Sequence, residues 1–524
     1  MSQFIAHLSQ PLEAPRARRA VVAAAMAAAL SGCSMIPAYE RPAAPVAPQW
    51  PQGSSADGAA LQVAAAAAAP DLPWQEFVLD ERLRAVIALT LENNRDLRIA
   101  VKNIEQAQAQ YRINRADLGP TVGASLSGSR SVPNTTSTPG SVASNYSAAL
   151  GINAWELDFF GRVRSLSQSA LSRYLATEEA RKAAQISMIG AVSSTWLSLQ
   201  ANSELLALAE RTLATREQSL SLTKLRMDVG ASSALDMRQA ESLTAAAKAA
   251  VAQQRRMRAQ DINALTLLVG QTLPENLLPP VPSVAVDRPS NDATQSTPVT
   301  PIGNTLSRFA SVHVGLPSGV LLRRPDIRAA EQQLVAANAN IGAARANFFP
   351  RITLTGMFGR SSHELDDLFG SGTLRVWSFL PQISLPIFDM GRNIATLDAS
   401  KAGRDIAVAQ YEKAIQTAFR EVADALAGRA TLGEQLAALE AQATANRESY
   451  RLADLRYRNG IASYLYLLDA QRALCASEQA LTQTRLLERL NQVELYKALG
   501  GGWSEPAPAS SSTPASQTAS AAAQ

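Results

Sequence analysis

Apolar residues fall at helical spacing over residues 80–117 and stop before Gly119 and Pro120. Since proline cannot continue a helix, this segment predicts one helix that ends at residue 117. The positions that carry the pattern are Leu83, Ile87, Leu91, Leu97 and Ile104.

The period changes to two after Pro120, where Val122, Ala124 and Leu126 alternate with small or hydroxylated residues. Residues 146–154 also keep their apolar side chains on one parity. Period-two patterns predict β-strands, and the Pro-, Gly- and Ser-rich residues 131–144 predict the loop between them.

A second pair of strands is predicted further along, the first from Ile352, Leu354 and Phe358. The last strand contains Pro381 and carries its apolar residues on the opposite parity to the earlier strand. We therefore expect a bulge or register slip in this last strand. Its apolar residues are Trp377, Phe379, Ile383 and Leu385.

Two long segments contain no proline, one from Gly161 to Gly230 and one from Gly391 to Gly460. A helix of about 70 residues would be about 105 Å long, which exceeds any globular core. Apolar residues seven apart in the first segment predict a coiled-coil seam. They are Val192, Leu199, Leu206, Leu213, Leu220 and Met227.

The body of the chain resembles itself at a constant offset of 230 residues. Six landmarks keep that offset, which indicates a duplication whose copies each read helix, strand, strand, helix, helix. The landmarks include Asp96-Leu97-Arg98 with Asp326-Ile327-Arg328, Pro120 with Pro350, Gly161 with Gly391, Gly230 with Gly460, and Gly270 with Gly500.

The composition argues against nucleic-acid binding and against enzymatic activity. The 524 residues include 49 basic and 45 acidic residues with only 5% aromatics, so neither a strong positive field nor stacking platforms for nucleic acid are present. Three histidines and two cysteines leave few metal ligands or nucleophiles, and no catalytic motif is found. We expect neither an enzyme nor a nucleic-acid partner.

The N-terminus predicts an export signal over residues 1–32. Arginines precede an apolar run from Ala20 to Leu30 that is too short to span a membrane. The sequence Leu30-Ser31-Gly32-Cys33 resembles a lipobox, which implies a lipid on Cys33, and Ser34 after it is typical of outer-membrane sorting. A plain signal followed by a chance cysteine is the alternative. Cys475 is then left without a partner, and we interpret it as a small apolar helix residue.

Four strands of bilayer-spanning length cannot close a barrel in one chain, and lipid does not tolerate open edges. If the strands span a membrane, the chain must oligomerise, and a conduit needs at least three copies because eight strands leave only a filled interior. Two alternatives remain open, namely a soluble β-subdomain and a lipid-anchored coiled-coil scaffold without a pore.

Several motifs together resemble the outer-membrane factors of the TolC-like superfamily, in the NodT-like lipoprotein branch. The resemblance covers Cys33 to about Gly501. It rests on the lipobox, Asn93-Asn94-Arg95-Asp96-Leu97, Trp155-Glu156-Leu157-Asp158-Phe159-Phe160-Gly161-Arg162, Leu316-Pro317-Ser318-Gly319, Arg323-Arg324-Pro325-Asp326-Ile327-Arg328, Tyr411-Glu412-Lys413-Ala414-Ile415, Phe419-Arg420-Glu421-Val422-Ala423-Asp424 and Tyr464-Leu465-Tyr466-Leu467-Leu468-Asp469-Ala470-Gln471-Arg472. Residues 283–312, rich in Pro, Ser and Thr, depart from the family pattern.

The resemblance implies a mainly α fold with a membrane β-barrel. Three copies would build twelve strands and a long α-helical barrel. The implied segments are the signal peptide 1–32, an anchored tether 33–72, repeat one 73–276, an equatorial linker 277–318, repeat two 319–502 and a disordered tail 503–524.

The resemblance also implies a periplasmic gate at Leu465, Asp469 and Arg472, spaced i, i+4, i+7 on one helical face. A hydrophobic ring would lie on a carboxylate ring, and Arg472 could pair with Asp469. Without the family, that pair would be an ordinary solvated one. Gly230 and Gly460 mark the helix ends that an adaptor would grip, and simple helix capping is compatible with that role.

We therefore expect a lipid-anchored channel of the bacterial outer membrane, with its helices extending into the periplasm. It would conduct drugs or other small toxic molecules from an RND-type inner-membrane pump through a periplasmic adaptor. No cofactor is expected beyond the lipid on Cys33. A duct for protein secretion is the alternative within transport.

Overall fold

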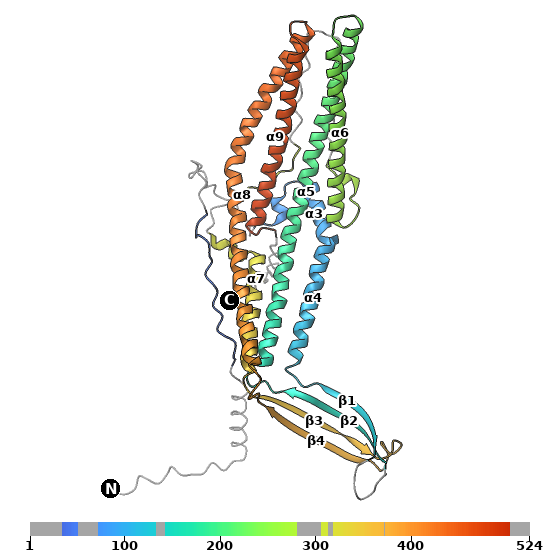
Figure 1. Ribbon diagram of the computed structural model, residues 1–524, viewed down its shortest axis with the longest axis vertical. Helices are drawn as coiled ribbons and strands as arrows, with labels where there is room; N and C mark the ends of the chain where they lie inside the picture. Colours follow the sequence, from blue (N-terminus) through green and yellow to red (C-terminus); the bar gives the residue numbers. More distant parts are fainter. Residues whose placement is uncertain are drawn as a thin grey trace, which may run out of the picture. The chain divides into compact units, whose positions relative to one another are not determined.

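The computed structural model describes residues 34–50, 72–132, 142–279, 305–312, 318–370 and 372–502 (Figure 1). The signal peptide, Cys33, the tail 503–524 and most of residues 283–312 lie outside these ranges. The elements are α2 Trp74–Phe77, α3 Glu81–Asn93, α4 Arg95–Ala116, β1 Val122–Ser131, β2 Ala143–Glu156, α5 Arg162–Asp228, α6 Ala234–Val269, η2 Glu275–Leu277, η3 Ser318–Arg323, α7 Pro325–Ala346, β3 Arg351–Ser362, β4 Leu374–Ser384, α8 Arg392–Arg458 and α9 Tyr464–Ala498.

The two proline-free segments form the single helices α5 and α8, each 67 residues long. This confirms the prediction of very long helices. The chain divides into two compact units, and α5 and α8 contribute residues to both. No helix of the described residues has the length and the apolar character needed to cross a membrane.

The first unit contains one antiparallel sheet in the order β1-β2-β3-β4. Every strand pairs with its sequence neighbour, from Val122 opposite Ile152 to Arg351 opposite Ser384. The predicted strands are thus confirmed. Because β1 and β4 lie at opposite ends of the order, neither edge of the sheet pairs with another strand among the described residues of one chain.

The irregularity of the sheet lies in β2 and not in β4, where the sequence predicted it. Pairing shifts between Ile152 and Trp155, and Ala154 between them takes a positive φ of 45°. The backbone N–H of Ala154 is satisfied by the Thr355 hydroxyl at 3.1 Å. Pro381 pairs with Leu354 without a slip. An edge strand tolerates proline because one row of its N–H groups has no ladder partner.

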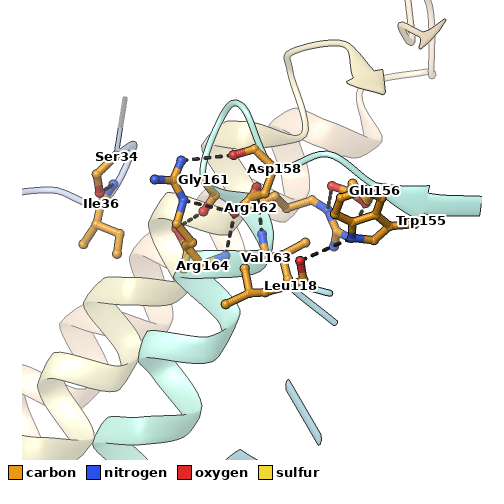
Figure 2. A network of polar contacts seen from close by, with 11 residues as sticks. Ser34, Ile36, Leu118, Trp155, Glu156, Asp158, Gly161, Arg162, Val163 and Arg164 are labelled. Atoms are coloured by element: carbon orange, nitrogen blue, oxygen red, sulfur yellow. Dashed lines mark hydrogen bonds and ion pairs between the residues drawn. The ribbon is translucent and has the colours of Figure 1, made fainter. Parts of the chain in front are cut away.

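The turn from β2 into α5 is held by charged side chains, which Figure 2 shows from close by. The Asp158 carboxylate accepts from the backbone N–H of Val163 at 3.1 Å and of Arg164 at 2.8 Å, so it caps the first turn of α5. Arg162 binds Glu156 with two hydrogen bonds of 2.8 and 2.7 Å. The motif at residues 155–162 therefore fixes the strand-to-helix corner.

Residues 34–45 run along α7 within the same unit. The Glu331 carboxylate accepts two hydrogen bonds from Arg41, of 2.7 and 2.9 Å, and one from the Tyr39 hydroxyl at 3.1 Å. Gly342 leaves room for this segment, since a Cβ there would lie 2.6 Å from Ile36. We call residues 34–45 the strap. The start of the expected tether is therefore bound to the fold.

The single helix predicted over residues 80–117 is wrong, because this segment forms two helices, α3 and α4. The chain breaks at Asn94, which has ψ 134° and separates α3 from α4. The Asn94 side chain accepts from the N–H of Leu97 at 3.0 Å and donates to the carbonyl of Leu268 at 2.7 Å. An asparagine at an N-cap satisfies a free helical N–H, so it stabilises the break between α3 and α4. The spacing of apolar residues predicted no such break.

The predicted seam on α5 is buried only along part of its length. Val192, Leu199 and Leu206 are buried and Leu213 is partly buried, but Met227 is 36% exposed. Apolar packing along this line therefore weakens toward the end of α5.

Candidate functional site at the helix turns

Each long helix ends in the same backbone turn around a glycine. Gly230 has φ 74°, its N–H donates to the Met227 carbonyl at 2.9 Å, and the N–H of Ala231 donates to the Arg226 carbonyl at 2.7 Å. This is the Schellman motif, which a residue with a Cβ adopts only with strain.

Gly460 repeats that turn with φ 73°. Its N–H donates to Tyr457 at 3.0 Å, and the N–H of Ile461 donates to Arg456 at 2.8 Å. Apart from the glycine and its chain neighbours, no atom of the described residues lies within 4 Å of the place that a Cβ would occupy at Gly230 or Gly460. The capping role expected of both glycines is thus confirmed, and their surroundings are open.

The three predicted gate residues lie in the first three turns of α9, all with exposed side chains. Leu465 is 67% exposed, as is Leu235, the residue 230 positions earlier. The opposite face of this part of α9 is buried and includes Leu467, Leu468, Gln471 and Leu474. The structure therefore places the three predicted gate residues on one exposed face, and their role as a gate stays a prediction.

The pairing expected between Asp469 and Arg472 in a closed trimer stays a prediction, and a single chain does not form it. Among the described residues, no ion pair or hydrogen bond joins the two side chains. Both are exposed, and a solvated pair gains too little to fix two mobile side chains in one geometry.

A buried ionic cluster, missed by sequence reasoning, lies further along the same helix. Glu478 of α9 accepts from Arg211 of α5 at 2.6 Å and from Arg447 of α8 at 3.1 Å. The Glu478 side chain is only 9% exposed. One carboxylate thus ties three helices together, and we call these three residues the Glu478 cluster.

Arg216 lies five residues after Arg211 on α5 and is also buried, at 6% exposure. Among the residues that the structure describes, its Nη1 has no hydrogen-bond partner. Burial lowers the pKa of this guanidinium, as does the nearby charge of Arg472. The sequence held a signal for this residue, because Arg216 follows the seam residue Leu213 by three positions, which is the second core position of a heptad.

Cys475 is a free, partly buried thiol on α9. Its sulfur lies 3.8 Å from the Thr212 hydroxyl, and burial raises the pKa of the thiol. A raised pKa disfavours the reactive thiolate, which agrees with a packing role. Within the ranges that the structure describes, no three His, Cys, Asp or Glu side chains gather as a metal site would require.

The family comparison matches most of this chain. The model of the outer membrane efflux protein family matches it twice, over residues 86–271 and 316–501. Both ends of the second match lie 230 residues after those of the first.

Individual relatives support the same family assignment. The probable efflux pump outer membrane protein TtgC of Pseudomonas putida is 48% identical over 479 residues, covering 91% of this chain and 94% of that protein. The outer membrane protein OprJ of Pseudomonas aeruginosa is 44% identical, covering 93% of this chain and 96% of its own.

A solved structure shares the fold over most of its length. The outer membrane channel MtrE of Neisseria gonorrhoeae in its open state aligns with a TM-score of 0.75 and 40% identity, over 90% of this chain and 99% of that one. These matches confirm the expected outer-membrane exit duct of an efflux pump, a protein that is not an enzyme. The chain belongs to the outer membrane efflux protein family.

Proposed function

We propose that three copies of this chain form the duct. Each would contribute the four strands β1 to β4 to a twelve-stranded barrel in the outer membrane, and α5, α6, α8 and α9 to a helical barrel in the periplasm. The observation that carries the proposal is the pair of open sheet edges at β1 and β4. Unpaired backbone groups are not tolerated in lipid, so β4 of one copy would pair with β1 of the next. The two tandem repeats, 73–276 and 319–502, would each supply one hairpin.

Apolar side chains on the edge strands support a lipid-facing surface. Leu126 of β1 is 71% exposed, and Trp377 and Phe379 of β4 are 74% and 62% exposed. Exposed apolar groups of this size are costly in water but not in lipid. A pore-free scaffold would have no use for them.

We further propose that a periplasmic adaptor docks at the turns around Gly230 and Gly460, linking the duct to an RND-type inner-membrane pump. The residues beside these glycines, Val229 and Ile461, are 72% and 69% exposed. Exposed apolar tips next to an open, Cβ-free turn allow close approach of a partner helix. The relatives are named as efflux pump outer membrane proteins.

Small toxic organic molecules are the proposed cargo. One relative is named a toluene efflux pump outer membrane protein and another an antibiotic efflux pump outer membrane protein. Both are 48% identical to this chain. No observation favours a protein-secretion duct.

The gate is proposed to close at Leu465, Asp469 and Arg472. In a trimer these exposed residues would form three stacked rings, and three unpaired Asp469 carboxylates would repel one another unless a cation bridges them. Opening would then be a shift in population, driven by a partner that binds the open arrangement better.

The gate is tested by replacing Asp469 and Arg472 together with alanine and recording single-channel currents in planar bilayers. We expect a small, cation-blocked conductance in the wild type and a larger one without block in the variant. The matched control is Gln239→Ala with Ser242→Ala, the exposed positions 230 residues earlier. Equal currents in wild type, variant and control would contradict the gate.

We propose that Cys33 carries a lipid that holds the chain at the membrane. The first described residues lie beside the last turn of α7, where Arg345 donates to the Met35 carbonyl at 3.4 Å. Strand β3 begins six residues after Arg345, at Arg351. A lipid on Cys33 would therefore emerge close to the start of a proposed membrane strand.

The strap is predicted to depend on Glu331. Replacing Glu331 with alanine removes three hydrogen bonds, two of them charge-assisted and worth roughly 1–3 kcal/mol each. Amide hydrogen exchange over residues 35–41 should therefore quicken about tenfold or more. Glu40→Gln, on an exposed neighbour, should leave it unchanged. Unchanged exchange in the Glu331 variant would show that the hydrogen bonds from Arg41 and Tyr39 to Glu331 do not hold the strap.

A further inference from the structure

Within the part of the chain that the structure describes, no carboxylate pairs with the Arg216 guanidinium, although it is buried inside one chain. Tyr464 contacts it by a side-chain hydrogen bond, and the groups whose charge acts on it, Tyr464, Tyr450, Arg472 and Cys475, include no carboxylate. The side chain is 94% buried by its own helices, so a neighbouring copy has little access to it. Its remaining polar contact on α6 uses only the backbone, where the Thr244 hydroxyl donates to the Arg216 carbonyl at 3.4 Å.

The side chains of α9 near Arg216 offer the guanidinium no negative charge. Tyr464, Gln471 and Cys475 are seven and four residues apart, which places them on one side of the helix. Among the described residues, Arg216 Nη1 is buried without a hydrogen-bond partner. The Tyr464 hydroxyl lies beside the guanidinium, and the Tyr450 hydroxyl of α8 lies near both Arg216 and Gln471. Burial raises the pKa of both phenols, so neither of them supplies a negative charge to offset the cation.

The Glu478 cluster on the same line is the contrast. There a buried carboxylate is shared by two arginines from two other helices. Removing a charge from water without a partner costs several kcal/mol, whereas a well-bonded cluster recovers most of that cost. The contact of α5 with α9 is therefore stabilised at the Glu478 cluster and destabilised at Arg216. Arg216 lies about 7.5 Å closer to the turn than Arg211 of that cluster, at the helical rise of 1.5 Å per residue.

We propose that Arg216 is a built-in bias toward separation of the two helical hairpins near their turns, with the Glu478 cluster as the fixed point. When α9 moves away from α5, water reaches the guanidinium and its burial cost is released. The Glu478 cluster stays closed, so the movement is confined to the part of the hairpins between Arg216 and the glycine turns. This rests on the proposed gating, because Leu465, Asp469 and Arg472 lie on the moving part of α9.

The test replaces the charge in two independent ways in the full-length protein. Arg216→Met removes the cation and keeps an apolar side chain of similar length. Gln471→Glu keeps the cation and offers it a carboxylate. Both should hold α9 against α5, so amide hydrogen exchange over residues 464–475 should slow about tenfold, as expected when an unpaired buried charge is neutralised. Arg238→Met, at an arginine that is 79% exposed on α6, is the control and should change nothing.

The double variant tests whether the change in hydrogen exchange comes from the charge of Arg216. Combining Arg216→Met with Gln471→Glu leaves a buried carboxylate without a partner, so exchange should return to the wild-type rate or exceed it. If either single variant exchanges as fast as wild type or faster, or if the double variant exchanges as slowly as the singles, the bias does not exist. Arg216→Met alone could disturb packing, but Gln471→Glu removes no side chain and decides the outcome in that case.

Single-channel recording separates this inference from the proposed gate. If exchange slows while the open fraction falls, both stand. If exchange slows and the currents are unchanged, Arg216 biases the hairpins but the gate residues do not control conduction.

Discussion

Replacing Glu478 with alanine should destabilise the protein more than any other single change considered for its helices. The substitution leaves Arg211 and Arg447 facing each other at a nearly buried position. Breaking a buried pair from one side typically costs 3–5 kcal/mol, about half of the stability of an ordinary domain. We therefore expect a lower midpoint of unfolding in chemical denaturation of the detergent-extracted protein, and faster proteolysis of α9.

Glu494→Ala is the matched control for this change. Glu494 lies on the same helix and pairs with Lys497 at 2.7 Å, but its side chain is 46% exposed. Exposed pairs contribute about 0–1 kcal/mol, so its midpoint should stay near that of the wild type. Equal midpoints in the Glu478 and Glu494 variants would show that the buried cluster does not hold the three helices.

The second large effect is expected from Gly359→Ala in β3. An added Cβ would lie 2.3 Å from the Ala148 carbonyl oxygen and 2.6 Å from the Ala149 Cα. Both atoms belong to the backbone of β2, so no side chain can rotate away. Overpacking of this kind costs about 1–3 kcal/mol or forces the strands apart. We expect much less folded protein in the outer membrane fraction, measured after detergent extraction.

Gly356→Ala on the same strand separates this clash from a general effect of losing glycine. A Cβ at Gly356 meets its nearest atom, the Ser378 carbonyl oxygen, at an ordinary 3.7 Å. Its yield should match that of the wild type. A normal yield of the Gly359 variant would mean that β2 and β3 approach less closely than described.

The long-range pattern of this chain was readable because each element carries a strong repeated signal. Absence of proline over about 70 residues predicts α5 and α8 closely, since nothing in those segments stops a helix. Period-two alternation likewise predicts the strands. The paired glycines mark helix ends because the turn needs a left-handed residue, and Gly230 and Gly460 take that conformation.

Features that depend on tertiary contacts were not readable. The break at Asn94 relies on the carbonyl of Leu268, which is 174 residues away in the chain. The bulge in β2 depends on Thr355 of β3, so the parity of β4 pointed to the wrong strand. The spacing of Leu465, Asp469 and Arg472 predicted one shared face of α9, and all three are exposed there, whereas their role as a gate and the pairing of Asp469 with Arg472 stay predictions for the trimer.

Buried charges were the main omission. Periodicity treats Arg216 and Glu478 as surface residues, because burial of a charge follows from which helices meet and not from the local sequence. Only the place of Arg216 three residues after the seam residue Leu213 indicated that one of them lies inward.

The central claim is that three copies close one barrel through β1 and β4, and a cysteine cross-link tests it most directly. Ser127 of β1 and Ser378 of β4 are replaced by cysteine in a Cys475→Ser background, and a short bifunctional thiol reagent is added to membranes. Within one chain these strands are separated by β2 and β3, about three strand spacings of ~4.8 Å, beyond the reach of such a reagent. The control pair Ser127→Cys with Ser147→Cys lies within one sheet, where the two hydroxyls are 2.7 Å apart, and should link only inside the chain.

The account predicts linked products of one, two and three copies and none larger, because the third link closes the ring. Products that stop at a single chain, or a ladder that continues beyond three copies, would contradict a closed trimeric duct.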